Sequence, residues 1–353
     1  MKTDIDTLLR TLIIKDASDL HLQGGSPPIF RINGELSVTD LSPLTSEEIE
    51  DRFVNTVMNK EQKEQFNRDH HIDLSYSVPG IARFRVNIFK QRGSVGAVMR
   101  AIPFEIPSTD DLGLPTVIKK LADRPHGLVL ITGPTGSGKS TTLASIIDYI
   151  NEHRKAHIIT VEDPIEFIFT NKSCLVNQRE VGKDTNSFAA ALRDALREDP
   201  DVILVGEMRD LETISNAITA AETGHLVFAT LHTNDAIQTV DRIIDVFPPH
   251  QQAQIRTQLA ATLQGVVSQR LLRKSDGTGR VAAFEIMLIT HAIKNLIQTG
   301  KTHQIYSAMQ TGREQGMLTM ARSLKRLCRE SVITREEAMK IVEDPKTFED
   351  MRD

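Results

Sequence analysis

The feature of the sequence that most constrains its fold is the glycine-rich run Gly133–Ser140, which lies between an apolar segment and an amphipathic one. The run fills the pattern G-x-x-x-x-G-K-[ST], and residues 127–132 before it are almost wholly apolar, as in a buried strand. After it, four apolar residues keep the i, i+3, i+4, i+7 spacing of a helix: Leu143, Ile146, Ile147 and Ile150. The three segments together predict a strand, a tight loop and a helix.

This loop has the chemistry of a phosphate-binding site. Backbone N–H groups can surround a phosphate only where no Cβ intrudes, and the following helix points the positive end of its dipole at the same anion. We expect Lys139 to reach the β- and γ-phosphates of ATP and Ser140 to bind Mg²⁺. The predicted cofactor-binding residues of the run are Gly133, Pro134, Thr135, Gly136, Ser137, Gly138, Lys139 and Ser140. The alternative, an accidental glycine-rich turn, is disfavoured by the matching strand and helix.

Composition is that of an ordinary globular protein of about two domains: 353 residues, 40% hydrophobic and 25% charged. No apolar stretch approaches the ~18 to 20 residues of a membrane span, and the first residues do not resemble a signal peptide, so we expect a cytoplasmic protein. Cys174 and Cys328 are too few for a zinc ribbon or a disulfide framework. A net charge of −5, no Trp and 3 Tyr argue against a nucleic-acid partner.

The chain before the loop, residues 1–103, reads as a small α/β domain. Ile5–Ile13 has helical spacing, Asn33-Gly34 is typical of a hairpin turn, and segments 71–76, 83–89 and 94–100 alternate in period two, as antiparallel strands do. Residues 104–116 contain several Pro and Gly residues and are predicted to be the linker between domains.

Residues 117–353 follow a different rhythm of apolar strand, polar loop and helix, which predicts a parallel sheet covered by helices. Buried strands are expected at 128–132, 157–161, 202–206 and 226–230, with a helical stripe over 188–196 that Asp199-Pro200 ends. From Gln251 onward, helical spacing dominates, including Ile255, Leu259 and Leu263. We therefore expect a helical C-terminal portion.

Polar residues follow these strands, at the edge where open α/β sheets bind ligands. Glu162 follows the second strand, Glu207 the third and His232 the fourth. Hydrolysis of ATP requires a metal, a carboxylate to activate water and a cation, and these groups supply each role. Gly206 stands where ordinary P-loop ATPases have a Mg²⁺-binding Asp, so Glu207 must serve instead. The alternatives are that the acidic residues cap helices and that His225 and His232 are structural.

These motifs closely resemble those of type IV pilus retraction ATPases, within the superfamily of secretion ATPases. The acidic box Thr160–Glu166, the atypical Walker B segment Asp199–Asp210 and the histidine box Thr223–Thr233 match the family's patterns, as does the early run Ala17–His21. With the phosphate loop, the matches extend over nearly the whole chain.

The resemblance implies a homohexameric ring whose protomers have a PAS-like N-terminal α/β domain and a RecA-like P-loop ATPase domain. It implies that Lys139, Ser140 and Thr141 hold phosphate and Mg²⁺. It also implies that Glu162 activates water, that Glu207 binds the Mg²⁺ region and that His232 senses the γ-phosphate. Further candidate cations by resemblance are Arg85, Arg100 and Arg270, although the last is as well explained as a surface or ion-pair arginine.

Retraction is favoured over extension by the same resemblance. Extension motors usually carry an extra N-terminal domain and a four-cysteine metal insertion, and this sequence is too short for the first and too poor in cysteine for the second. Ala292–Gln298 resembles the retraction element A-I-R-N-L-I-R, but Lys294 and Gln298 depart from it, and a packing helix is an equal alternative. The implied partners are an inner-membrane platform protein, through which the ring associates peripherally with the inner membrane, and a paralogous retraction ATPase. An accessory paralogue, a secretion-system ATPase, a nucleotide-switched assembly protein and a nucleic-acid translocase remain alternatives.

Overall fold

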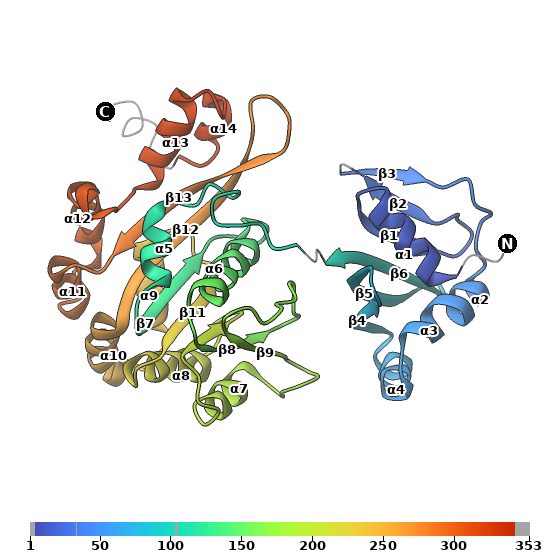
Figure 1. The fold of residues 1–353 in the computed structure, drawn as a ribbon, viewed down its shortest axis with the longest axis horizontal. Coiled ribbons are helices and arrows are strands. Elements are labelled where there is room, and N and C mark those ends of the chain that lie inside the picture. Colours follow the sequence, from blue (N-terminus) through green and yellow to red (C-terminus); the bar gives the residue numbers. More distant parts are fainter. Residues whose placement is uncertain (1–3, 33, 103–104, 343–353) are drawn as a thin grey trace. The chain divides into compact units, whose positions relative to one another are not determined.

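The computed structural model describes residues 4–32, 34–102 and 105–342, and it divides into two compact units, Met1–Glu105 and Ile106–Asp353 (Figure 1). The predicted domain boundary at residues 103–104 lies outside the described residues. Of the predicted linker, residues from Ile106 onward belong to the second unit, where Leu114 is buried and Ile106 and Leu112 pack against the core.

The first unit contains a six-stranded antiparallel sheet in the order β3-β2-β1-β6-β5-β4. Its strands are β1 (Ala17–Gln23), β2 (Ile29–Ile32), β3 (Glu35–Val38), β4 (His71–Val78), β5 (Ala82–Gln91) and β6 (Ser94–Ile102). Its helices are α1 (Ile5–Ile14), α2 (Ser46–Ile49), a π-helical turn (Glu50–Val54), α3 (Asn55–Val57) and α4 (Lys60–Asp69). The predicted hairpin is the β2–β3 connection, although Asn33 itself is outside the described residues.

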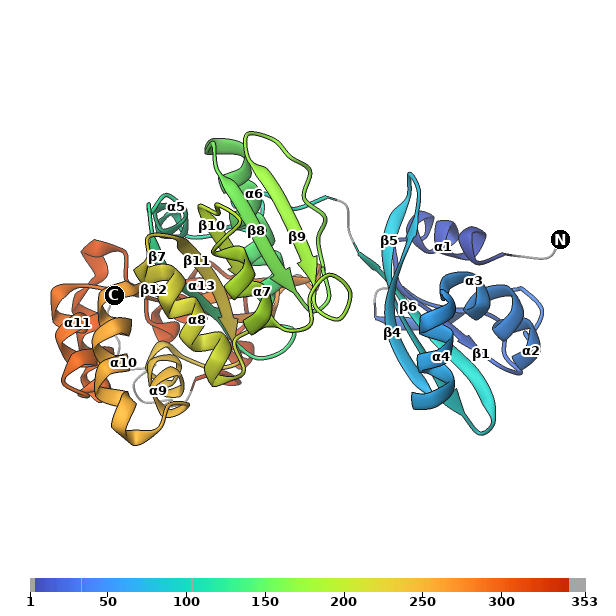
Figure 2. The same cartoon turned by 90° about the horizontal axis from the view of Figure 1, so that it is seen from below.

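The helices of the first unit lie on one face of this sheet (Figure 2). Apolar residues of α1, such as Leu9 and Leu12, are fully buried with Leu20 of β1 and Phe84 of β5. Because side chains alternate along a strand, the neighbouring positions of β1, β5 and β6 face the other side of the sheet, and several of them are charged. This unit is the mixed α/β N-terminal domain that the sequence predicts.

The second unit is built on a seven-stranded sheet in the order β13-β12-β7-β11-β10-β8-β9. Its strands are β7 (Gly127–Thr132), β8 (His157–Glu162), β9 (Leu175–Glu180), β10 (Val202–Val205), β11 (Leu226–Leu231), β12 (Leu263–Arg273) and β13 (Arg280–Leu288). All neighbouring strands are parallel except the β12–β13 pair. The four predicted parallel strands are therefore present, each within a residue of its expected ends.

Helices cover both faces of this sheet, as a RecA-like domain requires. They are α5 (Thr116–Ala122), α6 (Lys139–His153), α7 (Phe188–Ala195), α8 (Leu211–Glu222), α9 (Ala236–Asp245), α10 (Pro249–Thr262), α11 (His291–Gln298), α12 (Ile305–Thr311), α13 (Met320–Arg329) and α14 (Arg335–Met339), with 3₁₀ turns at Thr302–Gln304 and Arg313–Gln315. Val129 and Ile131 of β7 pack in the core with α5 and α6, whereas Leu128 and Leu130 pack in the core with α8, α9 and α10.

The C-terminal portion is less helical than predicted, and this prediction was wrong between residues 263 and 288. Leu263 begins β12, and the β12–β13 hairpin extends the sheet beyond β7 instead of continuing α10. The interior of β12 is buried because it lies between β7 and β13, but it includes the polar residues Ser268 and Gln269, so it is not a continuous apolar run like the predicted strands. Leu263, its first residue, also continues the helical spacing of Ile255 and Leu259, which favoured a helix.

Candidate nucleotide-binding and hydrolysis site

The phosphate loop lies between the end of β7 and the start of α6, as the sequence predicts. Gly133 has a φ of 140°, and a Cβ there would lie 2.4 Å from the carbonyl oxygen of Gln269. Gly138, the residue before α6, has a φ of 88°, and its Cβ would lie 2.7 Å from Nε2 of Gln269. Both positions therefore require glycine, for conformation and for space.

Strand β12 holds both flanks of this loop. The hydroxyl groups of Thr132 and Ser268 are 2.8 Å apart, and Oγ1 of Thr142 donates to Oε1 of Gln269 at 2.8 Å. The first contact fixes the end of β7 and the second fixes the first turn of α6. These contacts were not predicted, because residues 263–273 were expected to be part of the helical C-terminal portion and not a strand beside β7.

Lys139 is buried within the loop. Its Nζ donates to the carbonyl oxygens of Gly133 at 2.8 Å and Pro134 at 3.1 Å. Burial lowers the pKa of Lys139 from its usual value, and the negative charges of Glu207 and Glu166 oppose that shift. The ammonium group is thus held by two backbone carbonyl groups of the loop, and the charges of Glu207 and Glu166 act on it.

Glu162 ends β8 with a half-buried carboxyl group. Oγ1 of Thr160 donates to its Oε1 at 2.6 Å, and Nε2 of Gln178 donates to the same oxygen at 3.2 Å. Burial raises the pKa of Glu162 to about 7, while the hydrogen bonds from Thr160, Gln178 and the backbone of Glu166 act in the opposite direction. A carboxyl group with this pKa can accept a proton near neutral pH.

Glu207 follows β10 and contacts the side chains of Arg209 and His232. Its Oε1 lies 2.6 Å from Nε of Arg209 and 3.1 Å from Nε2 of His232, which follows β11. Desolvation raises the pKa of Glu207, but the hydrogen bond from Arg209 and the charge of His232 outweigh it, so the pKa is below its usual value. Glu207 is therefore ionised, as a metal ligand must be. Arg209 was not among the predicted site residues, although its position two residues after Glu207 in extended backbone suggests the contact.

The structure explains why Gly206 replaces the usual aspartate. Strands β8 and β10 are adjacent, and the N–H of Gly206 donates to the carbonyl oxygen of Val161 at 2.7 Å. A Cβ at position 206 would lie 3.1 Å from that oxygen and 3.3 Å from Cα of Glu162. The backbone carrying Glu162 therefore passes close to position 206, where a side chain would have to displace it, and the carboxylate that follows β10 is that of Glu207.

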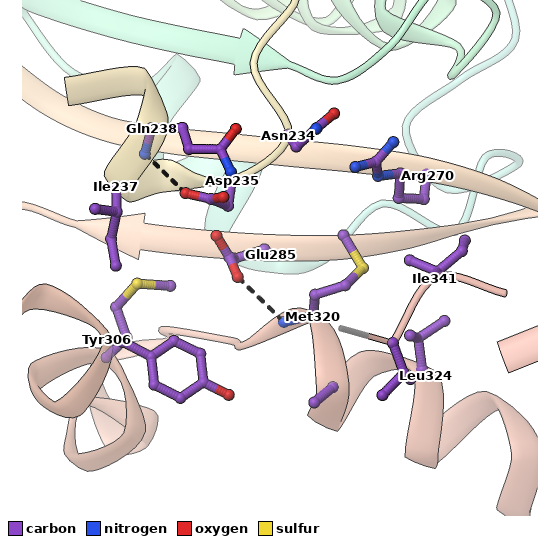
Figure 3. A pocket seen from close by; sticks show the side chains of 13 residues that line it. Asn234, Asp235, Ile237, Gln238, Arg270, Glu285, Tyr306, Met320, Leu324 and Ile341 are labelled. Atoms are coloured by element: carbon purple, nitrogen blue, oxygen red, sulfur yellow. Dashed lines mark hydrogen bonds between the residues drawn. The ribbon is translucent and has the colours of Figure 1, made fainter. Parts of the chain in front are cut away.

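Arg270 lies on the other face of the sheet from α6. Its neighbour Gln269 contacts α6, and successive strand residues point to opposite faces. Arg270 instead lines a pocket of about 470 Å³ with Asn234 and Asp235 at the start of α9, and with Glu285 of β13 (Figure 3). The structure therefore does not bring Arg270 to the side of the sheet that holds Lys139.

Arg85 and Arg100 belong to the first unit, where they are directly opposite each other on β5 and β6. Nε of Arg100 donates to Oδ1 of Asp19 at 2.8 Å, and Nε of Arg85 lies 3.6 Å from Oδ1 of Asp73. Both arginine side chains are largely exposed, on the face of the sheet away from the helices.

Several of the other polar residues after strands have structural roles. Asp210 and Asp235 accept backbone N–H groups as the N-caps of α8 and α9. His225 precedes β11, at the opposite end from His232, and its Nδ1 lies 2.9 Å from the carbonyl oxygen of Ala220. The structural alternative considered for acidic residues and for His225 is therefore correct at these three positions.

No helix in the described ranges has the length and apolarity that a membrane-spanning segment needs. Within the same ranges, no group of three or more His, Cys, Asp or Glu side chains is arranged as a metal site.

The fold and the site define a class. A mostly parallel sheet covered on both faces, with a glycine-rich phosphate loop between the interior strand β7 and helix α6, and with carboxylates at neighbouring strand ends, is the RecA-like P-loop ATPase architecture. The chain matches the family model described as Type II/IV secretion system protein over residues 1–340, and it belongs to that family.

Individual relatives agree over nearly the full length. The chain is 52% identical to the type IV pilus retraction ATPase PilT of Pseudomonas aeruginosa, covering 98% of this chain and 100% of the relative. It is 48% identical to a twitching motility protein of Neisseria gonorrhoeae, covering 97% and 91%. A crystal structure of the pilus retraction motor PilT with bound ADP superposes with a TM-score of 0.93 at 51% identity, covering 99% of this chain and 100% of that one.

Proposed function

We propose that this protein is a hexameric ATPase motor that drives retraction of type IV pili, with ATP as substrate and Mg²⁺ as metal cofactor. The convergence of Lys139, Glu207 and His232 at one edge of the sheet, with Glu162 on the adjacent strand, carries the hydrolytic part of the proposal. The similarity to retraction motors over nearly the whole chain supports pilus retraction as the process that is driven, and not pilus extension.

The residues of the phosphate loop suit a nucleoside triphosphate. Gly136 has a φ of 78°, a backbone conformation that favours glycine, and a Cβ there would meet nothing within 4 Å. The hydroxyl group of Ser140 makes no hydrogen bond within the described residues, so it is available as a metal ligand together with Glu207. Mg²⁺ bound there would neutralise phosphate charge. Thr141, the third residue of α6, completes the set that we assign to the phosphates.

The proposed chemistry is in-line attack of water on the γ-phosphorus. The carboxylate of Glu162 accepts a proton from the water as its oxygen bonds to phosphorus, and the bond to the β–γ bridging oxygen breaks, leaving ADP and inorganic phosphate. Lys139 stabilises the charge on the transferring phosphoryl group, and His232, held by Glu207, faces the same region. Arg85 and Arg100 are proposed as further cations for the phosphates, whereas the position of Arg270 favours a structural role.

Mechanical work requires that the two units change their relation as the nucleotide is hydrolysed. If the γ-phosphate is bound by groups from both units, ATP favours one arrangement and hydrolysis removes that preference. We propose that six protomers form a ring on the cytoplasmic side of the inner membrane. The ring would associate with the membrane only through a platform protein of the pilus machine, and a paralogous retraction ATPase would be a second partner.

Deletion of the gene tests the proposal most directly. Retraction predicts cells whose pili assemble but do not shorten, with twitching lost, and a Lys139→Ala allele should give the same phenotype. Cells without pili would contradict retraction and indicate an extension motor. Normal twitching in the deletion strain, with loss only when a second retraction ATPase is also deleted, would indicate an accessory paralogue.

Purified protein separates the motor from a nucleotide switch and from a nucleic-acid translocase. A motor should show steady-state ATP hydrolysis that rises as the ring forms, measured together with molecular mass by light scattering. Hydrolysis that is independent of assembly would favour a switch. Stimulation of hydrolysis by DNA would favour translocation.

A further inference from the structure

Gln178, on the edge strand β9, has an amide group that makes three hydrogen bonds. Its Oε1 accepts from the backbone N–H of Phe169 at 2.9 Å. Its Nε2 donates to the carbonyl oxygen of Phe167 at 2.8 Å and to Oε1 of Glu162 at 3.2 Å. Strand β9 pairs with β8 so that Gln178 lies directly opposite Thr160, the other donor to Glu162.

The orientation of this amide is fixed by its partners. A backbone N–H can only donate, so the Phe169 contact requires the oxygen of the Gln178 amide. The nitrogen is then necessarily the atom that faces Phe167 and Glu162. Both of its hydrogens are used by these two acceptors, and the side chain has no freedom to flip without losing bonds to all three partners.

These contacts connect the carboxyl group of Glu162 to the loop that follows it. Residues 163–170 carry Glu166, whose backbone also bonds the carboxylate and whose charge acts on both Glu162 and Lys139. Phe167 and Phe169 are buried, so the two backbone groups held by Gln178 are anchored in the core of the second unit. The side chain of Gln178 thus holds both the carboxyl group of Glu162 and the backbone of residues 167–169.

We propose that Gln178 is a positioning residue for ATP hydrolysis, which holds Glu162 in one rotamer with Oε2 turned away from the Thr160 and Gln178 donors. The inference rests on the proposed role of Glu162. Only glutamine has the required shape: asparagine is too short by one methylene, ionised glutamate has no donor, and methionine has the length without either polar group.

A role in positioning predicts a change in the pH dependence of hydrolysis, in addition to a lower rate. A hydrogen bond to a charged group is worth about 1.5 kcal/mol, which corresponds to roughly one pH unit. In Gln178→Met, the acid limb of the single-turnover rate should move upward by about one unit, because the Glu162 carboxylate loses a donor. With the Glu162 pKa near 7, the rate should fall about fivefold at pH 7 and little at pH 9.

The experiment measures single-turnover ATP hydrolysis of the full chain from pH 5.5 to 9.5. Asn177→Ala is the matched control, because Asn177 is an amide on the same strand that contacts His157 instead of Glu162, and its pH profile should match the wild type. If Gln178→Met does not fold, Gln178→Glu keeps an acceptor for Phe169 and the original volume, and its acid limb should move upward further.

Two results would overturn the inference. One is an acid limb that is unchanged in Gln178→Met, and the other is a loss of rate that is the same at every pH, which would indicate a purely structural role. Glu162→Gln, assayed in parallel, keeps the failures apart. Wild-type hydrolysis in Glu162→Gln would contradict the proposed function, whereas an inactive Glu162→Gln with an unchanged Gln178→Met would contradict the Gln178 inference alone.

Discussion

His232 and Glu207, which follow neighbouring strands of the sheet, are joined by a 3.1 Å contact between Nε2 and Oε1. Arg209 contacts the same oxygen from the exposed side. Glu207 is therefore held between the exposed guanidinium group of Arg209 and the imidazole of His232. If a change at the γ-phosphate moves His232, we expect Glu207 to move with it. Through this contact the state of the nucleotide would affect the position of Glu207, the proposed metal ligand.

Replacing His232 with alanine should lower ATP hydrolysis by about a hundredfold, because a preorganised group next to the developing charge is lost. Nucleotide affinity should change little, since Lys139 and the loop are intact. Steady-state assays and titration with a fluorescent nucleotide measure the two effects. His225→Ala is the control: it removes a histidine with structural contacts and should lower thermal stability but not turnover. Full activity in His232→Ala would remove the histidine from the mechanism.

Lys139→Ala should abolish hydrolysis while the protein remains folded. The side chain donates to Gly133 and Pro134 and makes no ion pair with any residue in the described part of the chain, so its removal leaves no buried carboxylate there without its partner. We expect turnover to fall at least a hundredfold. The circular dichroism spectrum should remain like that of the wild type. Lys172→Ala, which removes an exposed lysine paired with Asp148, should hydrolyse ATP normally. Comparable rates in both variants would contradict the assignment of the loop.

Glu162→Gln should separate activity from stability. The pKa of Glu162 is about 7 in the folded protein, above the usual 4.5, so ionising it costs folding free energy. That cost is absent below pH 4.5, grows as the pH rises and is complete above pH 7. The neutral variant should be inactive because it lacks the proposed base. Its Tm should be higher than that of the wild type, and the difference should be larger at pH 8 than at pH 5. Calorimetry at both values measures this, and a Tm difference that does not grow with pH would mean that burial does not raise this pKa.

Gly206→Ala tests the close approach of β8 and β10. The new Cβ would lie 3.1 Å from the carbonyl oxygen of Val161 and would push the backbone of Glu162. We expect a loss of stability of about 1 kcal/mol and a larger loss of turnover. Gly277→Ala is a control in open space, with a positive φ in a surface turn, where only a stability cost is expected. Unchanged hydrolysis in Gly206→Ala would show that Glu162 tolerates the shift.

Much of the second unit could be predicted because its central strands are short apolar runs bounded by Gly, Pro and acidic residues. The four strands around the phosphate loop were found this way, and with them the edge where Glu162, Glu207 and His232 lie. Strand β12 was not found, because polar residues such as Ser268 and Gln269 interrupt its apolar run and Leu263 continues the helical spacing of α10.

The helices α2 to α4 and strand β9 were also missed. Residues 46–58 carry an apolar stripe at helical spacing that the prediction left out, and its members are all in the core: Ile49, Phe53, Val54, Val57 and Met58. Thr45 caps α2, with which this stretch begins, and Asn59 caps α4, which follows it. Contacts such as Gln178 with Glu162 join residues that are distant in sequence. They depend on the β8–β9 pairing, and no local pattern predicts them.

Arg85 and Arg100 can be distinguished from each other by stability. The carboxyl group of Asp19 is almost fully buried and its Oδ1 is bonded by Arg100, whereas the Arg85–Asp73 pair is exposed. Arg100→Ala should therefore lower the free energy of unfolding by about 1 to 2 kcal/mol, with Ser18 and Arg31 still contacting Asp19, while Arg85→Ala should leave it almost unchanged. If both side chains bind phosphates, each variant should also lose turnover, and thermal unfolding beside ATPase assays measures the two effects separately. Wild-type turnover in the double variant would show that neither arginine acts on ATP, because the catalytic residues of the second unit would then suffice.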